Sequence, residues 1–390
     1  MIKDVVILGS TGSVGTSTLL SLSKVKNYKI KLITTNKNIK KILNQAIRYK
    51  VKDVIVEDKK KYNDYISKFK KKRIRLHLGI SNIKKILKKK VYYCINSISG
   101  IDGLYPTLIT IPLTKNLLMA NKESIICGWH LLKKELIKNK TNFVPIDSEH
   151  YSIWKLIKNE KFYNIDKIIL TASGGPFLNT PKNKIINIKP KFALKHPTWR
   201  MGKKISIDSS TMMNKIFEYI EAKKIFNINK KKINILIHPS SFVHAIVFFK
   251  GGVIKFLAHE TKMTIPISNA LEINSNINNL NFNVYIKNFN NMHFKKPDIK
   301  KFPLLSILNL IPEKDSYFET VLITLNDELV QKYLDGYINY ISIHKNLINL
   351  IKSPYLEKYY KLKPKNIYDI KKVMNIAKIY LEKKVKFYAQ

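Results

Sequence analysis

Short apolar runs and helical spacing alternate along the first part of the chain. The apolar runs at residues 4–8, 29–35, 53–57, 91–97 and 116–120 have the length of buried strands. Residues 16–23 and the Lys-rich stretches between the later runs are spaced like helices. Strands that alternate with helices favour a parallel sheet. We therefore expect an α/β fold whose residues 1–146 form a Rossmann-like dinucleotide-binding domain.

The pattern changes in the middle of the chain. Further strand-like runs lie at residues 168–171, 233–237, 245–249 and 253–258, the last two joined by Gly251-Gly252. N-cap residue types at Asp208–Thr211 precede an apolar-periodic run and predict a helix that begins near Ser209. These elements predict a central α+β domain over residues 147–273.

The last part of the chain is predicted to be helical. Residues 274–302 are rich in Asn and predict an irregular connector. Apolar residues then recur at helical spacing within residues 318–334 and 370–381. We expect a C-terminal helical bundle over residues 303–390.

Composition and charge narrow the class of protein. The 390 residues leave room for two or three domains, and two cysteines cannot form a disulfide scaffold, which favours a reducing, cytoplasmic location. No apolar run reaches the length of a membrane span. The net charge of +44 could favour a polyanion partner. Lysine is spread evenly beside frequent Ile and Asn, however, as in an AT-rich bacterial or symbiont genome. We expect neither a dedicated nucleic-acid partner nor a membrane partner.

Two segments of the first domain suggest a nucleotide. The glycine-rich turn Gly9–Gly15 lies between a strand and a helix, as a dinucleotide fingerprint requires, although Ser10 stands where the first glycine would be. The second strand ends in Thr34–Asn38 without a carboxylate for a ribose hydroxyl, and Lys37 could meet a 2′-phosphate. This pattern predicts NADPH rather than NADH. A tight turn and a surface lysine are the alternatives.

Carboxylates and hydroxyls suggest a metal and a phosphate. Asp147 and Glu149 would point the same way in extended backbone, and Glu218 would complete an all-oxygen set that favours Mg²⁺ or Mn²⁺. A helix that begins near Ser209, with Lys215 in its first turns, would bind a phosphate. The alternatives are a capping segment before a helix near Tyr151 and an amphipathic helix with charge pairs.

Three smaller features complete the candidate chemistry. Residues 121–124 follow a predicted strand at its carboxyl end, where a ligand crevice or a simple helix start is possible. Ser173-Gly174-Gly175 could offer a hydroxyl and backbone N–H groups to an oxyanion, or form a plain turn. The segment His196–Gly202 has the composition of a mobile cover.

Several segments together resemble one enzyme family. GSTGSVG, MANKES, IDSEHYSIW, LTASGGPF, KHPTWRMGKKISIDSSTMMNKIFEYIEA and IHPSSFVHA, in this order, are similar to 1-deoxy-D-xylulose 5-phosphate reductoisomerases. The resemblance implies a homodimeric enzyme that uses NADPH and Mg²⁺ or Mn²⁺. Its reaction rearranges and reduces 1-deoxy-D-xylulose 5-phosphate to 2-C-methyl-D-erythritol 4-phosphate, an isoprenoid precursor. Asn36 and Ala172 stand where the family often has Gly, and Asp327 stands where it usually has Glu.

The resemblance also implies roles for individual residues. The metal ligands fall on Asp147, Glu149 and Glu218, and catalytic roles fall on Lys122, Glu149, Glu218 and His244. Substrate contacts fall on Ser148, Glu149, Ser173, His196, Trp199, Ser209, Asn214, Lys215 and Glu218. Cofactor contacts fall on Thr11, Gly12, Ser13, Val14, Asn36, Lys37, Asn38, Asn121, Lys122, Glu123, Gly202 and Met263. Glu221 would lie near the metal, and Met201 would belong to the cover with Trp199.

Two other functions fit parts of the pattern. One is an NADP-linked dehydrogenase of another phosphorylated substrate, which would not require the carboxylate set. The other is a basic nucleic-acid-binding protein that has lost catalysis, which would bind duplexes at physiological salt.

Overall fold

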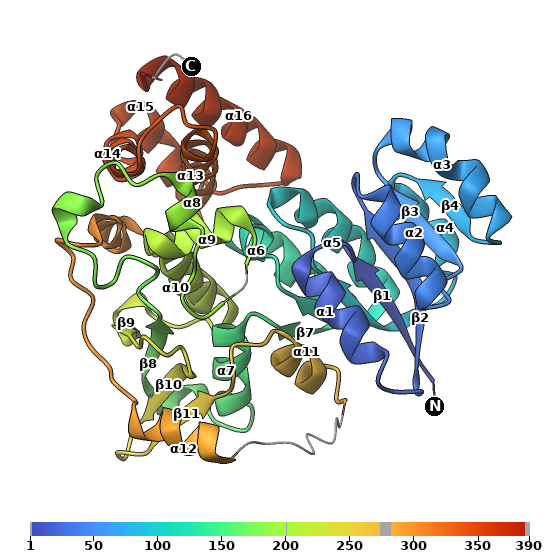
Figure 1. Ribbon diagram of the computed structural model, residues 1–390, viewed down its shortest axis with the longest axis horizontal. Helices are drawn as coiled ribbons and strands as arrows, with labels where there is room; N and C mark the ends of the chain where they lie inside the picture. Colours follow the sequence, from blue (N-terminus) through green and yellow to red (C-terminus); the bar gives the residue numbers. More distant parts are fainter. Residues whose placement is uncertain (1, 200, 274–281, 387–390) are drawn as a thin grey trace. The chain divides into compact units, whose positions relative to one another are not determined.

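A computed structural model describes residues 2–199, 201–273 and 282–386 (Figure 1). The chain forms two compact units. Unit 1 comprises Met1–Ile125, Trp129–Trp154 and Lys262–Leu280, and unit 2 comprises Ile126–Gly128, Lys155–Thr261 and Asn281–Gln390.

Unit 1 is built on a parallel sheet of seven strands in the order β4-β3-β2-β1-β5-β6-β7. The strands are β1 (Lys3–Leu8), β2 (Tyr28–Thr35), β3 (Asp53–Val56), β4 (Arg75–Leu78), β5 (Val91–Asn96), β6 (Thr114–Met119) and β7 (Asn142–Pro145). The helices are α1 (Ser13–Leu22), α2 (Ile39–Arg48), α3 (Lys59–Lys71), α4 (Ile83–Ile86), α5 (Leu104–Thr110), α6 (Lys122–Lys138), α7 (Ser148–Ile157) and α11 (Thr264–Ala270). The expected Rossmann-like α/β domain is confirmed.

The strand order fixes where unit 1 can bind a ligand. Strands β2, β3 and β4 extend from one side of β1, and β5, β6 and β7 extend from the other. The carboxyl ends of β1 and β5 therefore border the point where the strand order reverses, which is the usual ligand crevice of an open parallel sheet. The loops that follow these two strands are Gly9–Gly12 and Ser97–Gly100.

Strand β4 was not predicted from the sequence. It lies at the sheet edge, and its apolar Leu76 and Leu78 alternate with polar Arg75 and His77. Both polar side chains bind the carboxylate of Asp53 on β3, with Arg75 Nε at 2.7 Å and His77 Nε2 at 3.0 Å. These contacts lie across neighbouring strands, so no local pattern could reveal them.

The helix α11 belongs to unit 1 and not, with residues 155–261, to unit 2. Its Ile267, Ala270 and the following Leu271 are buried, and it packs on α1. Ser268 Oγ donates to Ser21 Oγ at 3.0 Å, and the Tyr28 hydroxyl donates to the Leu271 carbonyl. The units therefore divide the chain differently from the expected boundary at residue 273.

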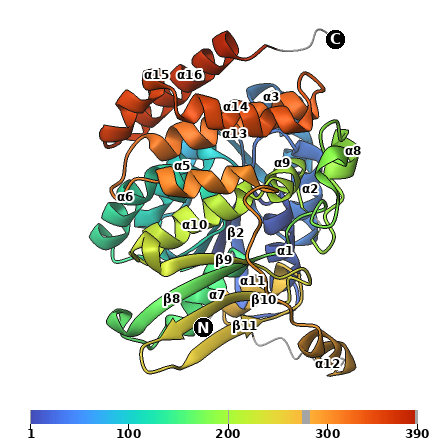
Figure 2. The same ribbon diagram turned by 90° about the vertical axis from the view of Figure 1, so that its left-hand side faces the viewer.

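Unit 2 contains a four-stranded mixed sheet in the order β11-β10-β8-β9. Its strands are β8 (Ile165–Ala172), β9 (Ile233–Ile237), β10 (Val243–Phe249) and β11 (Ile254–Ala258), and only the β8–β9 pair is parallel. Its helices are α8 (Pro190–Ala193), α9 (Lys203–Ser210), α10 (Met213–Ile225), α12 (Phe282–Asn290), α13 (Phe318–Leu334), α14 (Tyr340–Ile351), α15 (Pro354–Glu357) and α16 (Ile367–Lys384). Figure 2 shows α10 over the sheet and α13 and α14 beyond α10.

The expected helix start near Ser209 is wrong. Ser209 lies in the last turn of α9, and α10 begins only at Met213 after Met212 adopts a left-handed conformation with φ 65°. Ser210 Oγ donates to the Ile207 carbonyl at 2.7 Å, and Thr211 Oγ1 donates to the Asp208 carbonyl at 3.2 Å. These N-cap residue types therefore satisfy their hydroxyls inside a closing helical turn instead of opening a new helix.

The expected connector and C-terminal bundle are described in part. Residues 274–281 of the connector lie outside the described residues, and the helix α12 occupies part of a segment that was expected to be irregular. Apolar residues recur in this helix at helical spacing, and the high Asn content of the segment did not reveal this pattern. Helices α13, α14 and α16 pack together as the expected C-terminal helical region.

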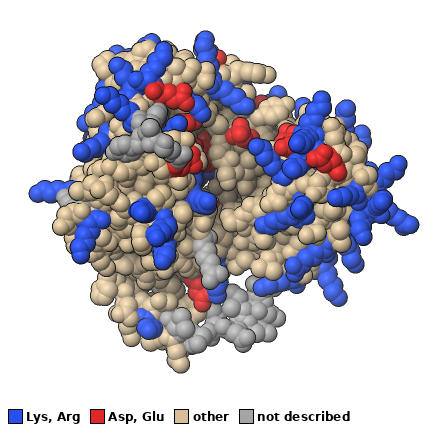
Figure 3. All heavy atoms as spheres, turned by 45° about the horizontal axis from the view of Figure 1, so that its top comes forward, with Lys and Arg blue, Asp and Glu red and all other residues tan. Residues whose placement is uncertain are grey.

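The positive charge is dispersed. On the face drawn in Figure 3, lysine and arginine side chains are scattered rather than gathered into one stripe. Among the described helices, none combines the length and the apolarity that crossing a bilayer would require.

Candidate active site

The glycine-rich turn after β1 has the geometry of a dinucleotide loop. Gly9 has φ +77°, and a Cβ there would lie 3.0 Å from the Ser97 carbonyl oxygen. A Cβ on Gly15 would lie 2.5 Å from the Ser10 Cα, so only Gly lets α1 approach β1 this closely. Gly9 thus takes the tight-turn position, and Ser10 is buried with its hydroxyl on Gln45 Oε1 at 2.8 Å. At the carboxyl end of β1, Thr11 and Gly12 precede α1, and Ser13 and Val14 are its first residues.

The second loop at the same sheet edge is held by Asn121. Its Oδ1 accepts the Ser124 backbone N–H at 2.6 Å, which caps α6, and its Nδ2 donates to the Gly100 carbonyl at 2.7 Å. Glu123 Oε2 accepts the Gly100 backbone N–H at 3.3 Å. Residues 121–123 are therefore both a helix start and the support of the Ser97–Gly100 loop, so the two interpretations of this segment are compatible.

Four more cofactor candidates lie in unit 1, and one lies in unit 2. Asn36, Lys37 and Asn38 are exposed between the end of β2 and the start of α2. Met263 directly precedes α11, which packs on the helix that follows the glycine-rich turn. Gly202 belongs to unit 2, where it precedes α9.

Lys122 and two carboxylates lie at the carboxyl ends of the neighbouring strands β6 and β7. Lys122 Nζ lies 2.8 Å from Asp147 Oδ1, and His150 Nδ1 lies 3.2 Å from Asp147 Oδ2. Burial alone would raise the pKa of Asp147, but the Lys122 ammonium and the His150 ring lower it well below its ordinary value. Asp147 is therefore an ionised carboxylate at neutral pH.

Glu149 comes close to Asp147, but for a reason other than the expected one. Helix α7 begins at Ser148, so Glu149 lies in its first turn and not in extended backbone. Carboxylate oxygens of Asp147 and Glu149 still lie within 4.8 Å of each other. Ser148 Oγ donates to Glu149 Oε2, and both residues are in unit 1. The sequence analysis missed His150, although its position three residues after Asp147 is the spacing at which helical neighbours meet.

In unit 2, His196 lies between two serine hydroxyls from different segments. Its Nε2 lies 3.1 Å from Ser173 Oγ and 3.1 Å from Ser209 Oγ. Its Nδ1 accepts the backbone N–H groups of Trp199 at 2.9 Å and Thr198 at 3.2 Å. Because both of these groups can only donate, Nδ1 carries no proton and Nε2 carries it. We call His196, Ser173 and Ser209 the His196 cluster.

The charge around the His196 cluster is positive. Burial, together with the smaller effect of the Lys215 ammonium, lowers the pKa of His196 to about 4. All three members of the cluster are partly exposed, whereas Asp208 and Ser210 beside Ser209 are buried. A neutral imidazole N–H, two hydroxyls and a nearby ammonium form a donor set suited to an anion such as phosphate.

Helix α10 supplies a buried group of polar residues to unit 2. Lys215 and Glu218 are 4% and 1% exposed, and they form an ion pair through Lys215 Nζ and Glu218 Oε2. Asn214 Nδ2 donates to Glu218 Oε1 at 2.5 Å. The i, i+3 and i, i+4 spacings place all three on one face of the helix.

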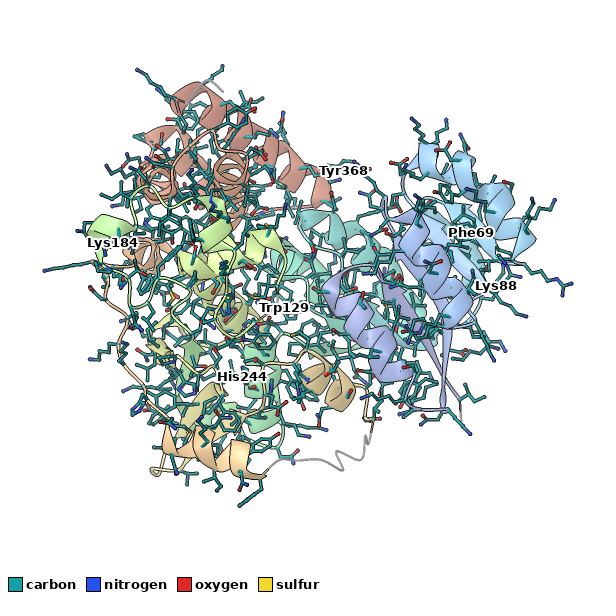
Figure 4. All side chains as sticks on the ribbon, viewed as in Figure 1. Phe69, Lys88, Trp129, Lys184, His244 and Tyr368 are labelled. Carbon is teal, nitrogen blue, oxygen red and sulfur yellow. The ribbon has the colours of Figure 1, made fainter. Side chains whose placement is uncertain are left out.

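The cover segment contacts one histidine of the sheet, which in turn stacks on a second histidine. The Trp199 ring meets the His244 ring edge to face at 6.0 Å, and His244 stacks on His259 at 3.8 Å. His244, labelled in Figure 4, lies on β10 with Nε2 3.1 Å from the His259 carbonyl oxygen. Thr261 Oγ1 donates to the Thr198 carbonyl at 3.2 Å. Trp199 and His244 are therefore brought together, while Met201 lies two residues further along the cover.

Gly175 fixes the distance between two parts of the His196 cluster. It has φ +68°, and a Cβ there would lie 2.8 Å from the Ser209 carbonyl oxygen and 2.9 Å from the Ser210 Cα. Its backbone N–H also donates to Ser173 Oγ at 3.1 Å. The loop after β8 can therefore contact the end of α9 only if this residue is Gly.

Comparisons with known proteins agree along the chain. Family models match in order: 1-deoxy-D-xylulose 5-phosphate reductoisomerase over residues 5–128, its C-terminal domain over residues 143–226, and the DXP reductoisomerase C-terminal domain over residues 259–380. The chain is 48% identical to the 1-deoxy-D-xylulose 5-phosphate reductoisomerase of Pelagibacter ubique, over 94% of this chain and 96% of that protein. It is 39% identical to that of Wolbachia pipientis wMel, over 87% and 88%.

Solved structures with the same name share the fold. The enzyme of Zymomonas mobilis in complex with NADPH has a TM-score of 0.88 and 29% identity, covering 98% of this chain and 99% of that chain. A DOX-P reductoisomerase in complex with NADPH, fosmidomycin and magnesium has a TM-score of 0.88 and 28% identity, covering 98% of both chains. The chain therefore belongs to the 1-deoxy-D-xylulose 5-phosphate reductoisomerase family.

Proposed function

We propose that this chain converts 1-deoxy-D-xylulose 5-phosphate to 2-C-methyl-D-erythritol 4-phosphate, with NADPH and a divalent cation. The observation that carries the proposal is the His196 cluster with Lys215 nearby in unit 2, in a chain of this family. This donor set suits the phosphate of a phosphorylated sugar. Unit 1 supports the NADPH part of the proposal, because it has a parallel sheet with a glycine-rich dinucleotide loop.

The phosphate would be held by groups that need little rearrangement. His196 Nε2–H and the Ser173 and Ser209 hydroxyls can donate to phosphate oxygens, while Lys215 and Asn214 approach from the first turn of α10. Each hydrogen bond to the charged phosphate stabilises the complex by about 1.5–3 kcal/mol. Because the phosphate does not react, this binding energy can serve to order the rest of the substrate.

We assign the cation to Asp147, Glu149 and Glu218. Asp147 is ionised, its oxygens lie within 4.8 Å of those of Glu149, and the donors are all oxygen, which fits Mg²⁺ or Mn²⁺. Ser148 orients Glu149, and Lys122 stands beside Asp147 as a donor for a substrate oxygen. A bound cation would stabilise negative charge on the substrate's oxygens as the carbon skeleton rearranges. Glu221 also lies on α10, one turn after Glu218.

We assign NADPH to unit 1. Thr11, Gly12, Ser13 and Val14 would hold its pyrophosphate at the start of α1, and Asn36, Lys37 and Asn38 would meet its 2′-phosphate. Asn121, Lys122, Glu123, Gly202 and Met263 would line the remainder of the cofactor. Bound NADPH supplies a hydride for the reduction.

The cover segment would exclude water from the reaction. Its backbone turn is held by His196 Nδ1, and its Trp199 ring rests against His244. His196 therefore links the phosphate donors to the position of Trp199. Exclusion of water strengthens the electrostatic interactions within the closed site.

We also propose that the protein is a homodimer. Strand β11 is an edge of the sheet in unit 2, and Val253, Ile254 and Phe256 beside or on it are 54%, 54% and 46% exposed. An unpaired edge with exposed apolar residues supports association with a second copy.

Isotope transfer tests the proposed reaction. The purified chain is incubated with 1-deoxy-D-xylulose 5-phosphate, Mg²⁺ and NADPH that carries deuterium at the hydride position. We expect a product of the mass of deuterated 2-C-methyl-D-erythritol 4-phosphate. If the substrate is recovered unchanged, or if deuterium enters only when another phosphorylated substrate is supplied, the proposal fails.

A further inference from the structure

We infer that Asn326, on the C-terminal helix α13, is a positioning residue for the substrate's phosphate. It acts through Asp208, the residue that precedes Ser209 in α9. Asn326 Nδ2 donates to Asp208 Oδ1 at 2.8 Å, although the two residues are 118 positions apart. This inference rests on the proposed function, because it assigns Ser209 to the phosphate site.

The Asp208 carboxylate is an unusual group in this position. Asp208 is 2% exposed and Asn326 is completely buried. A buried carboxylate is tolerated only when hydrogen bonds and opposite charges replace its water. Lys204 Nζ supplies part of that charge, at 3.6 Å from Asp208 Oδ2 and 2.8 Å from Asp327 Oδ1. Asn326 thus offers a hydrogen-bond donor to Asp208 of α9, and the neighbouring Asp327 offers a carboxylate to Lys204 of the same helix.

The last turn of α9 transmits this contact to the His196 cluster. Asp208 and Ser209 are consecutive helical residues, so they point in directions about 100° apart. One side chain therefore reaches α13 while the other reaches His196 Nε2 at 3.1 Å. A shift of Asp208 moves Ser209 by a similar amount, because both belong to one rigid turn.

A second contact from the C-terminal helices supports the same turn. The Tyr340 hydroxyl, at the start of α14, donates to Ser210 Oγ at 3.1 Å, and both residues are buried. On the other side, the close approach of Gly175 leaves the turn no space to move toward β8. The end of α9 is therefore held between the loop after β8 and the C-terminal helices. The contact of Asn326 differs from these two because it satisfies a buried charge.

The inference predicts a specific kinetic effect. Replacing the amide in Asn326→Asp puts two carboxylates against each other and pushes the end of α9 away from α13. The substrate KM should rise about tenfold or more, which corresponds to about 1.4 kcal/mol or more of lost binding. The NADPH KM should change less than about twofold, because its proposed contacts lie in unit 1 apart from Gly202, which precedes α9 at the end opposite Asp208.

The test uses a reciprocal exchange. Asp208→Asn and Asn326→Asp are each measured alone and then combined in one chain, where Asn at 208 can donate to Asp at 326. We expect the double variant to recover a substrate KM within about threefold of wild type. Glu328→Gln is the matched control: it lies on the same helix α13 and loses only the exposed ion pair with Lys378. If Asn326→Asp does not fold, Asn326→Ser, which adds no charge, is measured in its place.

Binding of inorganic phosphate, followed by ³¹P line broadening on the full chain, separates this inference from the proposed function. Weaker phosphate binding in Asn326→Asp with recovery in the double variant supports the inference even in a chain that does not turn over the deoxyxylulose phosphate. The inference is overturned if Asn326→Asp lowers only the melting temperature, with a substrate KM and phosphate binding equal to those of Glu328→Gln. An unrepaired double variant would overturn it as well.

Discussion

His196 connects two parts of unit 2 through opposite edges of one ring. Nε2 faces the Ser173 and Ser209 hydroxyls, and Nδ1 accepts the backbone N–H groups that shape the cover before Trp199. The bonds to Nδ1 require a neutral ring with its proton on Nε2, and the two hydroxyls can accept from Nε2–H. Protonation of Nδ1 would replace this acceptor by an N–H that faces two other N–H groups, so the folded protein disfavours it.

Stability should therefore depend on pH through His196. Its pKa is lowered from 6.5 to about 4 in the folded protein, so below about pH 6.5 the unfolded chain binds the proton more tightly. The stabilising contribution is complete above that pH and is lost as the pH falls toward about 4. For a partly exposed ring, allowing for solvent screening, we expect a loss of about 1–2 kcal/mol.

The measurement is urea unfolding of wild type and His196→Gln at about pH 7 and about pH 5. The glutamine does not titrate, so wild type should lose more stability than the variant between the two pH values. An equal loss in both proteins would show that His196 does not titrate in this range.

Glu218 carries the second residue-scale prediction. Glu218→Gln removes the charge that we assign to the cation but keeps an oxygen that can accept from Asn214. Turnover should fall at least about a hundredfold, and the affinity for Mn²⁺ should weaken, because a neutral amide is a poor ligand for a hard ion. Circular dichroism checks that the fold survives.

Glu313→Gln is the control, since Glu313 is an exposed partner of Lys230 on the same unit. Normal turnover of Glu218→Gln in saturating Mn²⁺ would refute the ligand assignment.

At the scale of elements, the contact between the loop after β8 and the end of α9 decides the geometry of the His196 cluster. Gly175 permits it, and α9, α10 and the loop after β8 each contribute one part of the donor set. The sequence indicated the residues but assigned Ser209 to the wrong end of a helix. The correct arrangement depends on the left-handed Met212, which ends α9 and lets α10 begin.

Gly175→Ala tests this contact. A Cβ on Gly175 would lie 2.8 Å from a backbone oxygen of α9, so the loop and the helix must separate. We expect the substrate KM to rise about tenfold with an unchanged NADPH KM, measured by steady-state kinetics.

The control is Gly251→Ala in the β10–β11 turn. Gly251 has φ +91° with nothing within 4 Å of the added Cβ. Both variants bear the cost of a left-handed Ala, about 1–2 kcal/mol, but only Gly175→Ala should change the substrate KM. Similar KM values in the two variants would show that backbone strain alone explains the effect.

At the scale of the whole molecule, local pattern predicted more of unit 1 than of unit 2. Parallel strands such as β1 and β5 contain continuous apolar runs, which made them visible in the sequence, and the family resemblance supplied the candidate residues. The edge strand β4 and the Asn326–Asp208 bond depend on contacts between distant segments, which no local window contains. The placement of α11 with unit 1 has the same origin.

Association is the first whole-molecule prediction. Light scattering after size exclusion should give a dimer mass for wild type, whereas Phe256→Lys places a charge on the exposed edge strand β11 and should shift the protein toward monomer. Lys255→Glu is less informative because Lys255 pairs with Glu160. An unchanged dimer in Phe256→Lys would place the interface elsewhere, and a monomeric wild type would rule out the homodimer.

The most direct measurement of the central claim follows NADPH absorbance during incubation with 1-deoxy-D-xylulose 5-phosphate. The account predicts oxidation that requires the substrate, stops when a chelator removes divalent ions and resumes when Mg²⁺ or Mn²⁺ is restored. Oxidation that continues at full rate in the chelator, or no oxidation under any of these conditions, would contradict it.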